Sequence, residues 1–303
     1  MPTLNAQNNI ESCIESILRQ NPYEIIVVDS GSTDKTLSIL KRKYGNYRLK
    51  ILKAPALTSK QSSKRATLKV VAFNMGVKSA SGDIIALINQ DIILERDWWA
   101  KLSKHYLDRN VVTVGCVILH AGDDLSWISN YEVKGGYSDS IAISGHAYTF
   151  RLKTAMDIDY FRETIWEGTD KNPIEDADLC IRLLERGKQY IDEEAVALHN
   201  HPVNNFGNLI KRSIDLGCAR AIFAATYKQV GKTGVKRGLR QLSIVGLWIE
   251  NYFQLSRIKR KYSRFYKPKK SIFVLSIYAT IRNLLVTLSM GYTLLSKMFV
   301  LSA

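Results

Sequence analysis

The first 120 residues alternate between short apolar runs and amphipathic stretches, and this alternation limits the chain to a few folds. The apolar runs at 24–29, 48–53, 83–88 and 111–119 have the length and the Ile, Val and Leu content of buried strands. Helical spacing of apolar residues fills the intervals at 10–18, 33–44, 68–79 and 98–107, and the polar stretch 55–67 is typical of a loop. This order predicts a Rossmann-like α/β domain with a mostly parallel sheet and helices on both faces.

Two of the predicted strands end in an acidic residue. Asp29 closes the first run, and Asp91 follows the third. Ligands of open α/β sheets bind at the carboxyl ends of the strands, so either acid could reach a ligand. Each could instead form a local turn through backbone hydrogen bonds, the common role of a lone Asp after a strand. Neither GxGxxG nor GxxxxGK[ST] occurs, which counts against a dinucleotide oxidoreductase or a P-loop NTPase.

The stretch 172–187 has the signals of a helix with an unusually acidic start. Asn172 is a candidate N-cap, Pro173 fits the first helical position, and Gly187 marks the end. Three acids lie in its first turn: Glu175, Asp176 and Asp178. They could complement the positive end of the helix dipole, or the helix start could carry a catalytic carboxylate into a cleft. This stretch alone does not separate the two interpretations.

The net charge of +15 comes from the C-terminal third of the chain. Residues 1–202 hold 25 Lys and Arg against 26 Asp and Glu, whereas residues 203–303 hold 18 basic and two acidic residues. Such a segment suits anionic lipid, nucleic acid or acidic small molecules. The cysteines lie far apart without CxxC spacing, which predicts reduced core thiols in a cytosolic protein: Cys13, Cys116, Cys180 and Cys218.

The C-terminal third predicts helices at 205–230 and 239–255, then a basic run at 257–270 and an apolar segment at 271–303. Arg282 interrupts the apolar segment, at a cost of about 2.5–3.5 kcal/mol in a spanning helix. One polar stripe also recurs along it: Ser276, Thr280, Asn283 and Thr287. We therefore expect amphipathic helices in the membrane interface, with a single tilted transmembrane helix or RNA binding as alternatives.

Five stretches of the chain resemble, in order, motifs of the family 2 glycosyltransferases, which have the GT-A nucleotide-sugar fold. They are Pro2-Thr3-Leu4-Asn5, the segment 27–36, Asn74-x-Gly76 with the run 80–83, Asn89-Gln90-Asp91, and Trp166-Glu167 together with 175–182 and His199. The combination is specific although each piece alone is weak. The resemblance implies a GT-A domain over 1–215 and a basic, helical membrane-association region over 216–303.

The resemblance also implies which residues hold the donor and a metal. The nucleotide sugar would contact eight residues: Pro2, Thr3, Asn5, Asp29, Ser32, Asp83, Asn89 and Gln90. Asp91 and His199 would hold a divalent metal, Mn²⁺ or Mg²⁺, which would neutralise the leaving nucleoside diphosphate. His201 would share the side of His199 on a strand, so a structural role of either histidine stays open.

By the same resemblance, Asp176 would be the general base that takes the proton of the acceptor hydroxyl, and a single displacement implies inversion. Trp166, Glu175 and His146 would lie on the acceptor side, although Trp166 and His146 could equally be packed residues. Glu175 and Asp178 would support the helix start and a neighbouring cation such as Arg182.

Three features depart from the family pattern. Asn89 replaces the first acid of the metal motif, which lowers the charge of the site. Phe73 precedes Asn74 where a basic residue is usual, so that phosphate contact would come from Lys69 or Lys64. The family's first strand would precede Pro2, so the sheet is expected to lack that strand or to have it truncated.

The resemblance, together with the basic C-terminal third, implies a metal-dependent, inverting glycosyltransferase of polysaccharide biosynthesis in the cell envelope. It would act at the cytoplasmic face of the membrane, with an anionic membrane surface as a partner and no nucleic acid. Its substrates would be a nucleoside-diphosphate sugar and a lipid-linked or cell-surface glycan. The alternatives are a catalytically inactive nucleotide-sugar or glycan-binding relative and, further off, a nucleic-acid-binding protein.

Overall fold

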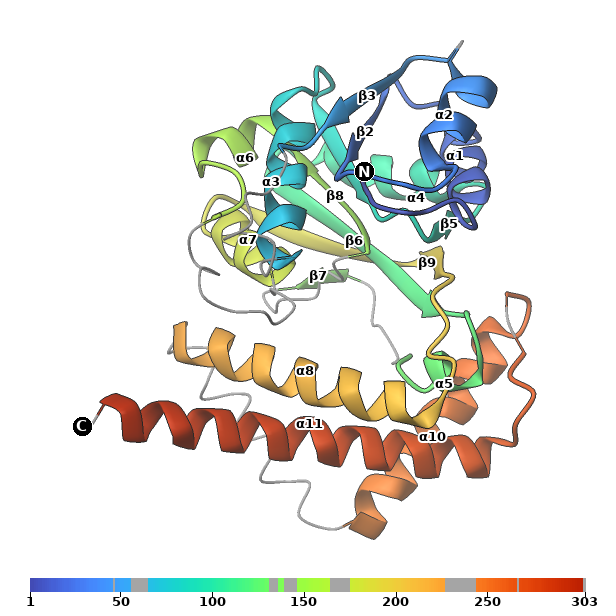
Figure 1. The fold of residues 1–303 in the computed structure, drawn as a ribbon, viewed down its shortest axis with the longest axis vertical. Helices are drawn as coiled ribbons and strands as arrows, with labels where there is room; N and C mark the ends of the chain where they lie inside the picture. The colour runs from blue at the N-terminus through green and yellow to red at the C-terminus, as the bar shows by residue number, and fades with distance from the viewer. Residues whose placement is uncertain are drawn as a thin grey trace. The chain divides into compact units, whose positions relative to one another are not determined.

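The computed structural model of the chain describes residues 1–45, 47–55, 65–130, 136–138, 146–163, 175–226, 244–265 and 267–301. These residues form two compact units (Figure 1). Those of the first, which we call the sheet unit, fall within 1–119, 133–170 and 175–200. Those of the second, the helical unit, fall within 120–132 and 201–303. The predicted domain boundary after residue 215 therefore lies inside a helix of the second unit.

A three-stranded parallel sheet begins the sheet unit. Its strands β1 (Pro2–Thr3), β2 (Ile25–Asp29) and β3 (Leu49–Lys53) lie in the order β1-β2-β3. They are connected by α1 (Ile10–Leu18) and α2 (Thr36–Tyr44), as the alternating pattern predicts for parallel neighbours. The helices bury aliphatic side chains against the sheet, and this apolar layer stabilises it: Ile10, Ile14, Val27 and Leu40.

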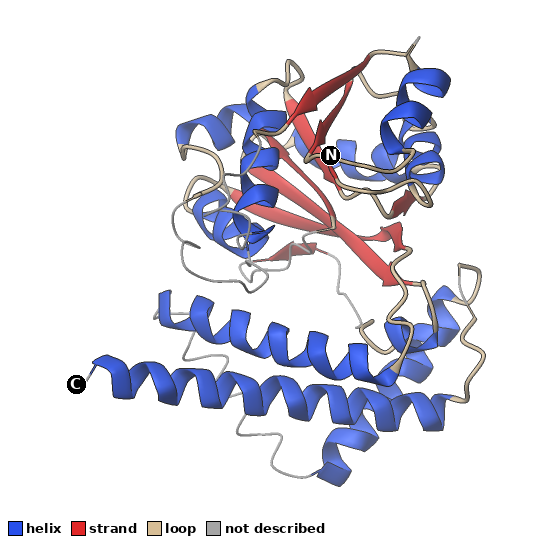
Figure 2. Cartoon of the chain, in the orientation of Figure 1, coloured by secondary structure: helices blue, strands red, loops and turns tan. Residues whose placement is uncertain are grey.

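A six-stranded sheet forms the rest of the core (Figure 2). Its strands are β4 (Ile84–Ile88), β5 (Ile92–Leu94), β6 (Val111–His120), β7 (Gly136–Ser138), β8 (Ala147–Arg151) and β9 (Lys188–His199). Strand β8 runs antiparallel to β4 and β6, and β9 runs antiparallel to β5 and β7. The α/β class is confirmed, but the prediction of a mostly parallel sheet is wrong here. The alternating pattern ends near residue 120, and the later strands β8 and β9 supply antiparallel neighbours.

Helices of the sheet unit cover these strands. They are α3 (Arg65–Lys78), α4 (Trp98–Ser103) with the 3₁₀ turn η1 (Lys104–Leu107), α6 (Leu152–Asp157) and α7 (Glu175–Leu184). The predictions at 68–79 and 98–107 are confirmed by α3 and by α4 with η1. Trp98 and Leu102 of α4 pack into the core of the six-stranded sheet. All four cysteines are free thiols, as predicted.

A cavity of about 470 Å³ lies between β2 and β4, with Ile26, Ile84 and Val77 among its lining residues. Strand β1 is only two residues long and pairs with Val28 and Asp29. Met1 extends this pairing, because its amino group donates to the carbonyl of Ile26 at 2.8 Å and its carbonyl accepts from the Val28 amide at 2.9 Å. Pro2 and Thr3 therefore lie in the strand itself, whereas the motif comparison had placed them in the turn after it.

The helical unit contains α5 (Asp124–Trp127), α8 (Phe206–Thr226), α10 (Ile244–Tyr262) and α11 (Ile272–Leu301). Helix α11 packs along both α8 and α10. A Cβ atom added at Gly217 of α8 would lie only 2.4 Å from the carbonyl oxygen of Val286 in α11. The two helix backbones therefore approach each other closely at this glycine.

Part of the polar stripe on α11 is a contact between helices. The Asn251 side chain of α10 donates to Thr280 Oγ1 at 3.1 Å and accepts from Asn283 Nδ2 at 3.2 Å. Ser276 is fully buried. The expectation that this stripe forms the polar face of an interfacial helix is therefore wrong for Thr280 and Asn283, which contact α10, and for buried Ser276; Thr287 is exposed.

The exposed face of α11 is apolar. Four large side chains at helical spacing form it: Phe273, Ile277, Leu288 and Tyr292. In the described chain one helix, Ile272–Thr293 within α11, has the length and apolar composition needed to cross a membrane. An exposed apolar stripe of this kind marks an interaction surface rather than an ordinary solvated face.

Candidate functional site

The loops that follow β1 and β2 are joined through Asn5. Its amide donates to Ser32 Oγ at 2.9 Å, and its side-chain oxygen accepts from the Thr33 amide at 2.9 Å. Asn5 has a φ of 49°, a left-handed conformation that Asn tolerates better than most residues. The Ser30 amide donates to the carbonyl of Thr3 at 2.8 Å. The structure thus brings the predicted donor-side residues Thr3, Asn5 and Ser32 together at the ends of adjacent parallel strands.

Asp29 ends β2 and is 3% exposed. Its carboxylate accepts hydrogen bonds from the amides of Gly31 and Ser32, each at 3.1 Å. Gly31 has a φ of 96°, which favours glycine at this turn. These are the local turn contacts that were the alternative interpretation of Asp29. A carboxylate has about four lone-pair sites, so this turn leaves acceptor capacity for a ligand.

Asn89 and Gln90 follow β4 and connect it to other segments. The Gln90 side chain accepts from the Leu4 amide at 2.7 Å and donates to the Leu4 carbonyl at 3.2 Å. Asn89 Nδ2 lies 3.2 Å from His146 Nδ1, and the Asn89 amide donates to the His146 carbonyl at 2.9 Å. Sequence analysis placed His146 on the acceptor side, but the structure places it against the predicted metal motif.

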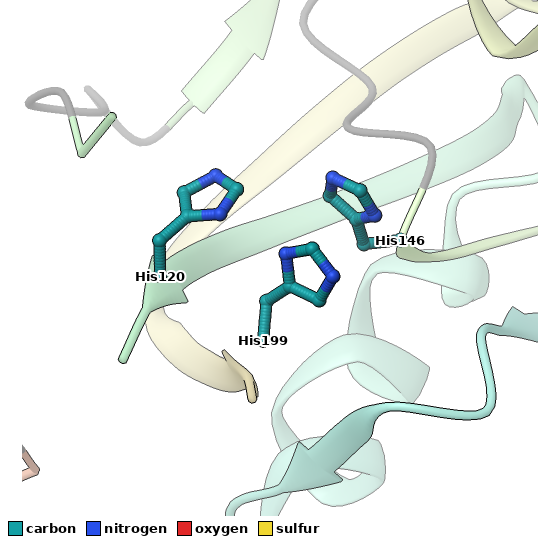
Figure 3. Close-up of side chains that lie close together, drawn as sticks. All are labelled: His120, His146 and His199. Carbon is teal, nitrogen blue, oxygen red and sulfur yellow. The ribbon is translucent and has the colours of Figure 1, made fainter. Parts of the chain in front are cut away.

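Asp91 and His199 lie side by side, as the resemblance implies for metal ligands. Asp91 Oδ2 is 3.1 Å from His199 Nε2, and the His199 ring stacks on that of His146 with centroids 4.0 Å apart. Figure 3 shows these two imidazoles beside that of His120, which ends β6, and one ring nitrogen of each lies within 4.8 Å of the others. Sequence analysis did not identify His120. His201 lies beyond the end of β9 and is exposed, so it does not share a strand face with His199.

The side chains around Asp91 fit a divalent cation. Asp91 offers a carboxylate oxygen, and His199 offers an imidazole nitrogen. The Oδ1 atom of Asn89 is buried and has no hydrogen-bond partner among the described residues, so an amide oxygen remains for a ligand. Oxygen donors with one or more imidazoles suit Mn²⁺ better than Mg²⁺, which prefers oxygen alone. Because Asn89 stands in place of an acid, this donor set carries less negative charge than two carboxylates would.

The first turn of α7 distributes its three acids among different partners. Lys69 of α3 places Nζ 2.5 Å from Glu175 Oε1. Arg182 places Nη2 2.8 Å from Asp178 Oδ2. The prediction that Glu175 and Asp178 support the helix start and a neighbouring cation is consistent with both pairs, with Lys69 as a partner the sequence did not suggest. Asp176 is half-buried between these two residues.

The pKa of Asp176 is raised to about 7, mainly by burial and further by Glu175, while Lys69 opposes the shift. A helix dipole by itself would lower the pKa of an acid at this position. The direction found is therefore the opposite of what simple dipole complementation predicts. A carboxyl group that titrates near neutral pH is suited to accept a proton during a reaction.

A second set of polar contacts holds α7 in place. Arg182 donates to Asp178 Oδ2 through Nε at 3.0 Å and Nη2 at 2.8 Å, and it also donates to two carbonyls of the segment 158–161. Asn74 of α3 donates to the carbonyl of Phe161 at 2.9 Å and accepts from its amide at 3.0 Å. The motif residue Asn74 thus has a structural role, because it and Arg182 fix the same segment.

One predicted site residue, Asp83, is not brought to this region. Asp83 precedes β4 whereas Asn89 follows it, so a five-residue strand, roughly 17 Å long, separates them. Trp166 lies outside the described residues. Of the two lysines expected to contact phosphate, Lys69 pairs with Glu175 and Lys64 lies outside the described residues. Sequence analysis also missed Tyr148, whose hydroxyl is fully buried and has no hydrogen-bond partner among the described residues.

The helix-covered sheets have the GT-A fold, and the protein is a glycosyltransferase of that class. More particularly, the chain belongs to glycosyl transferase family 2, whose sequence profile matches residues 1–164. The expectation of that family from the quoted motifs is confirmed.

Similar proteins share this family or fold. One relative is dolichyl N-acetyl-alpha-D-glucosaminyl phosphate 3-beta-D-2,3-diacetamido-2,3-dideoxy-beta-D-glucuronosyltransferase from Methanococcus voltae. It is 23% identical over 237 residues, which cover 73% of this chain and 72% of the relative. The mannosyltransferase PcManGT from Pyrobaculum calidifontis, solved with GDP-Man and Mn²⁺, has a TM-score of 0.60 at 17% identity, covering 97% of this chain and 85% of its own. S. aureus TarS in complex with UDP-GlcNAc has a TM-score of 0.52 at 14% identity, covering 96% and 90%.

Proposed function

We propose that the protein is an inverting, metal-dependent glycosyltransferase that uses a nucleoside-diphosphate sugar, with Asp176 as general base. One observation carries the proposal. Burial by itself would lower the pKa of Lys69, yet that pKa is raised because Glu175, Asp176 and Asp91 all attract its ammonium. Asp176, the candidate base, and Asp91, the candidate metal ligand, therefore both attract the ammonium of Lys69. This is expected if the two acids line one catalytic cleft.

The chemistry assigned to Asp176 is proton transfer during a single displacement. Its carboxylate takes the proton of the acceptor hydroxyl while that oxygen attacks the anomeric carbon of the donor sugar. The bond from that carbon to the nucleoside diphosphate breaks on the opposite side, so the configuration inverts. A pKa near 7 lets the group be ionised before the reaction and protonated after it at neutral pH.

The donor is assigned to the ends of β1, β2 and β4. Asn5, Ser32 and Asp29 would hold the nucleotide by hydrogen bonds, with Thr3 and Pro2 in the strand beneath them. Gln90 fixes the Leu4 backbone of the same loop. We leave Asp83 out of this assignment because it lies at the other end of β4.

Asp91, His199 and Asn89 would hold a divalent cation beside the diphosphate. When bound, this cation supplies charge neutralisation for the leaving nucleoside diphosphate. The mannosyltransferase PcManGT, whose fold the chain shares, was solved with Mn²⁺. That likeness and the mixed oxygen and nitrogen donors favour Mn²⁺.

We assign the acceptor to one chemical class, the lipid-linked or cell-surface glycans. The relative from Methanococcus voltae is named for a dolichyl phosphate sugar, and another relative is a dolichol-phosphate mannosyltransferase. An acceptor anchored in lipid requires the enzyme to work at a membrane surface. The helical unit has the two features that such binding needs, an apolar face and a basic run.

The membrane-binding surface proposed for the helical unit is the apolar stripe of α11 together with the basic run 257–270. Phe273 and Leu288 are 53% and 69% exposed, and the basic run holds eight Lys and Arg. Each basic residue near anionic lipid contributes about 1 kcal/mol to binding. The occupant of this surface is an anionic bilayer on the cytoplasmic side, with α11 lying in the interface.

Turnover is tested with the full chain and a panel of UDP-, GDP- and dTDP-sugars, with Mn²⁺ or Mg²⁺, by measuring release of the nucleoside diphosphate. Transfer to a polyprenyl-phosphate glycan, with the product anomer assigned by NMR, checks inversion. Asp176→Asn should abolish turnover, and Asp157→Asn, on an exposed position of α6, should not. If the wild-type chain and Asp157→Asn both bind the nucleotide sugar but neither turns it over, the alternative of an inactive binding relative is favoured.

Membrane binding is tested by flotation with vesicles of phosphatidylcholine alone or with phosphatidylglycerol. The protein should float only with the anionic vesicles, and salt should weaken the binding. Phe273→Ser combined with Leu288→Ser should reduce flotation, whereas Leu107→Ser, at an exposed apolar residue of the sheet unit, should not. Binding to RNA in a gel shift, without flotation, would favour the nucleic-acid alternative.

A further inference from the structure

The helix that carries Asp176 is bridged to α3 by one ion pair. Lys69 Nζ lies 2.5 Å from Glu175 Oε1, and the same ammonium lies 5.2 Å from the centre of the Phe73 ring. Glu175 is the residue directly before Asp176. We propose that Lys69 is a positioning residue that neutralises Glu175 and so keeps Asp176 ionisable as the base, an inference that rests on the proposed function.

The burial of Glu175 makes a partner necessary. Its side chain is 3% exposed, whereas that of Lys69 is 36% exposed. A buried carboxylate is strongly destabilised without a counter-charge. The ammonium of Lys69 supplies that counter-charge from a different helix, α3. The ion pair therefore compensates the charge of Glu175 and fixes its position.

The charge of Glu175 acts directly on Asp176. Two carboxylates in one helical turn cannot both ionise easily in a poorly solvated site, so each disfavours the charge on the other. Lys69 opposes this repulsion. Without the ammonium, Asp176 would hold its proton to higher pH, and a smaller fraction of it would be ionised and able to act as the base at neutral pH.

Two further groups face this cluster, Tyr148 and Asp91, and neither is a cation. Tyr148 of β8 stays neutral, because burial first, and then Asp176 and Glu175, hold its pKa well above the ordinary range. Asp91 also attracts the ammonium of Lys69. Lys69 is thus a cation that Glu175, Asp176 and Asp91 all attract.

The experiment compares Lys69→Met, Lys69→Arg and Glu175→Gln in the full chain. The acid limb of the pH profile of kcat/KM reports ionisation of the base. With Lys69→Met its midpoint should move up by about one pH unit or more, and with Glu175→Gln it should move down. Lys69→Arg keeps the charge and should leave the midpoint where it is. If the Lys69–Glu175 pair were purely structural, removing either partner would not move the midpoint of the pH profile in opposite directions.

A second measurement does not depend on turnover. The carboxyl of Asp176 is titrated by ¹³C NMR in the protein without substrate and is assigned by comparison with Asp176→Asn. The same opposite shifts should appear there, and they would support this inference even if no donor were turned over and the proposed function failed.

Two results would overturn the inference. One is a midpoint that stays fixed in both Lys69→Met and Glu175→Gln while stability falls. The other is a raised KM for the donor with an unchanged midpoint, which would assign Lys69 to the diphosphate instead. If Lys69→Met does not fold, the downward shift in Glu175→Gln remains the deciding result.

Discussion

The Asp91 carboxylate and the His199 imidazole are 108 residues apart in the sequence and 3.1 Å apart in the sheet unit. Strands β5 and β9 bring them together, because Asp91 directly precedes β5 and the antiparallel pairing sets Ile92 opposite His199. The buried Oδ1 of Asn89 belongs to the same group. This arrangement allows the metal assignment to be tested without reference to turnover.

Mn²⁺ affinity is expected to respond in opposite directions to two changes. Asp91→Asn should weaken binding at least about tenfold, because it removes the charged oxygen ligand. Asn89→Asp should strengthen binding, because it adds a negative charge to the site. Titration followed by EPR of free Mn²⁺ measures both. Asp83→Asn, at the opposite end of β4, is the matched control, and an equal loss of affinity there would contradict the assignment.

Removing the base should affect the chemical step. Asp176→Asn is expected to lower kcat by about 10²–10⁴ and to leave donor binding nearly unchanged, because the amide keeps the shape but cannot accept the proton. Steady-state kinetics with calorimetric donor binding separates the two effects. A variant that binds the donor normally and still turns over at the wild-type rate would contradict the role.

The pH dependence follows from the raised pKa of Asp176. Activity should rise as pH increases through about 7, because the base works only when ionised. Stability should change in the opposite sense. Since the folded state binds the proton more tightly than the unfolded state, stability falls as pH rises from about 4 to 7. Asp176→Asn should remove this loss and melt at a higher temperature than wild type at pH 8, with no such advantage at pH 4.

Breaking the buried pair of α7 should be costly. Arg182→Met removes the close cation of the buried Asp178 carboxylate and leaves only exposed Arg162, 3.7 Å from Oδ1. We expect a loss of about 3–5 kcal/mol in the free energy of unfolding. Arg182→Lys should also destabilise, because a single ammonium cannot reproduce the two-nitrogen contact to Asp178 Oδ2. Urea unfolding measures both variants. A loss below about 1 kcal/mol in Arg182→Met would place the pair among ordinary surface contacts.

Two glycines of the helical unit should respond differently to alanine. Gly217→Ala should destabilise, because its Cβ would lie 2.4 Å from the Val286 carbonyl oxygen. Gly291→Ala should stabilise by about 0.5–1 kcal/mol, because nothing lies within 4 Å of the added atom and alanine favours the helix. Thermal unfolding compares the pair. Equal effects would mean that α8 and α11 do not pack closely at Gly217.

Local pattern was sufficient for the longer elements up to residue 120, but not for the short strands β1 and β5. The run before Asp29 is apolar and bounded by turn signals, so β2 could be predicted from neighbours in sequence alone. The same holds for α2 and β6, and the motifs around Asp29 and Asp91 pointed to the right family. Later strands could not be placed in this way, because an antiparallel partner is set by contacts between distant segments.

By itself, the sequence determined the strand and helix order of the first part, the acidic start of α7 and the basic C-terminal third. Only the tertiary structure decided which charge meets which. Glu175 pairs with Lys69 and Asp178 with Arg182, His146 joins His199, and part of the polar stripe of α11 is buried against Asn251. The reason is physical: the pKa of a carboxyl and the side of a helix that is buried depend on burial and on charges a few ångströms away, which packing between distant segments creates.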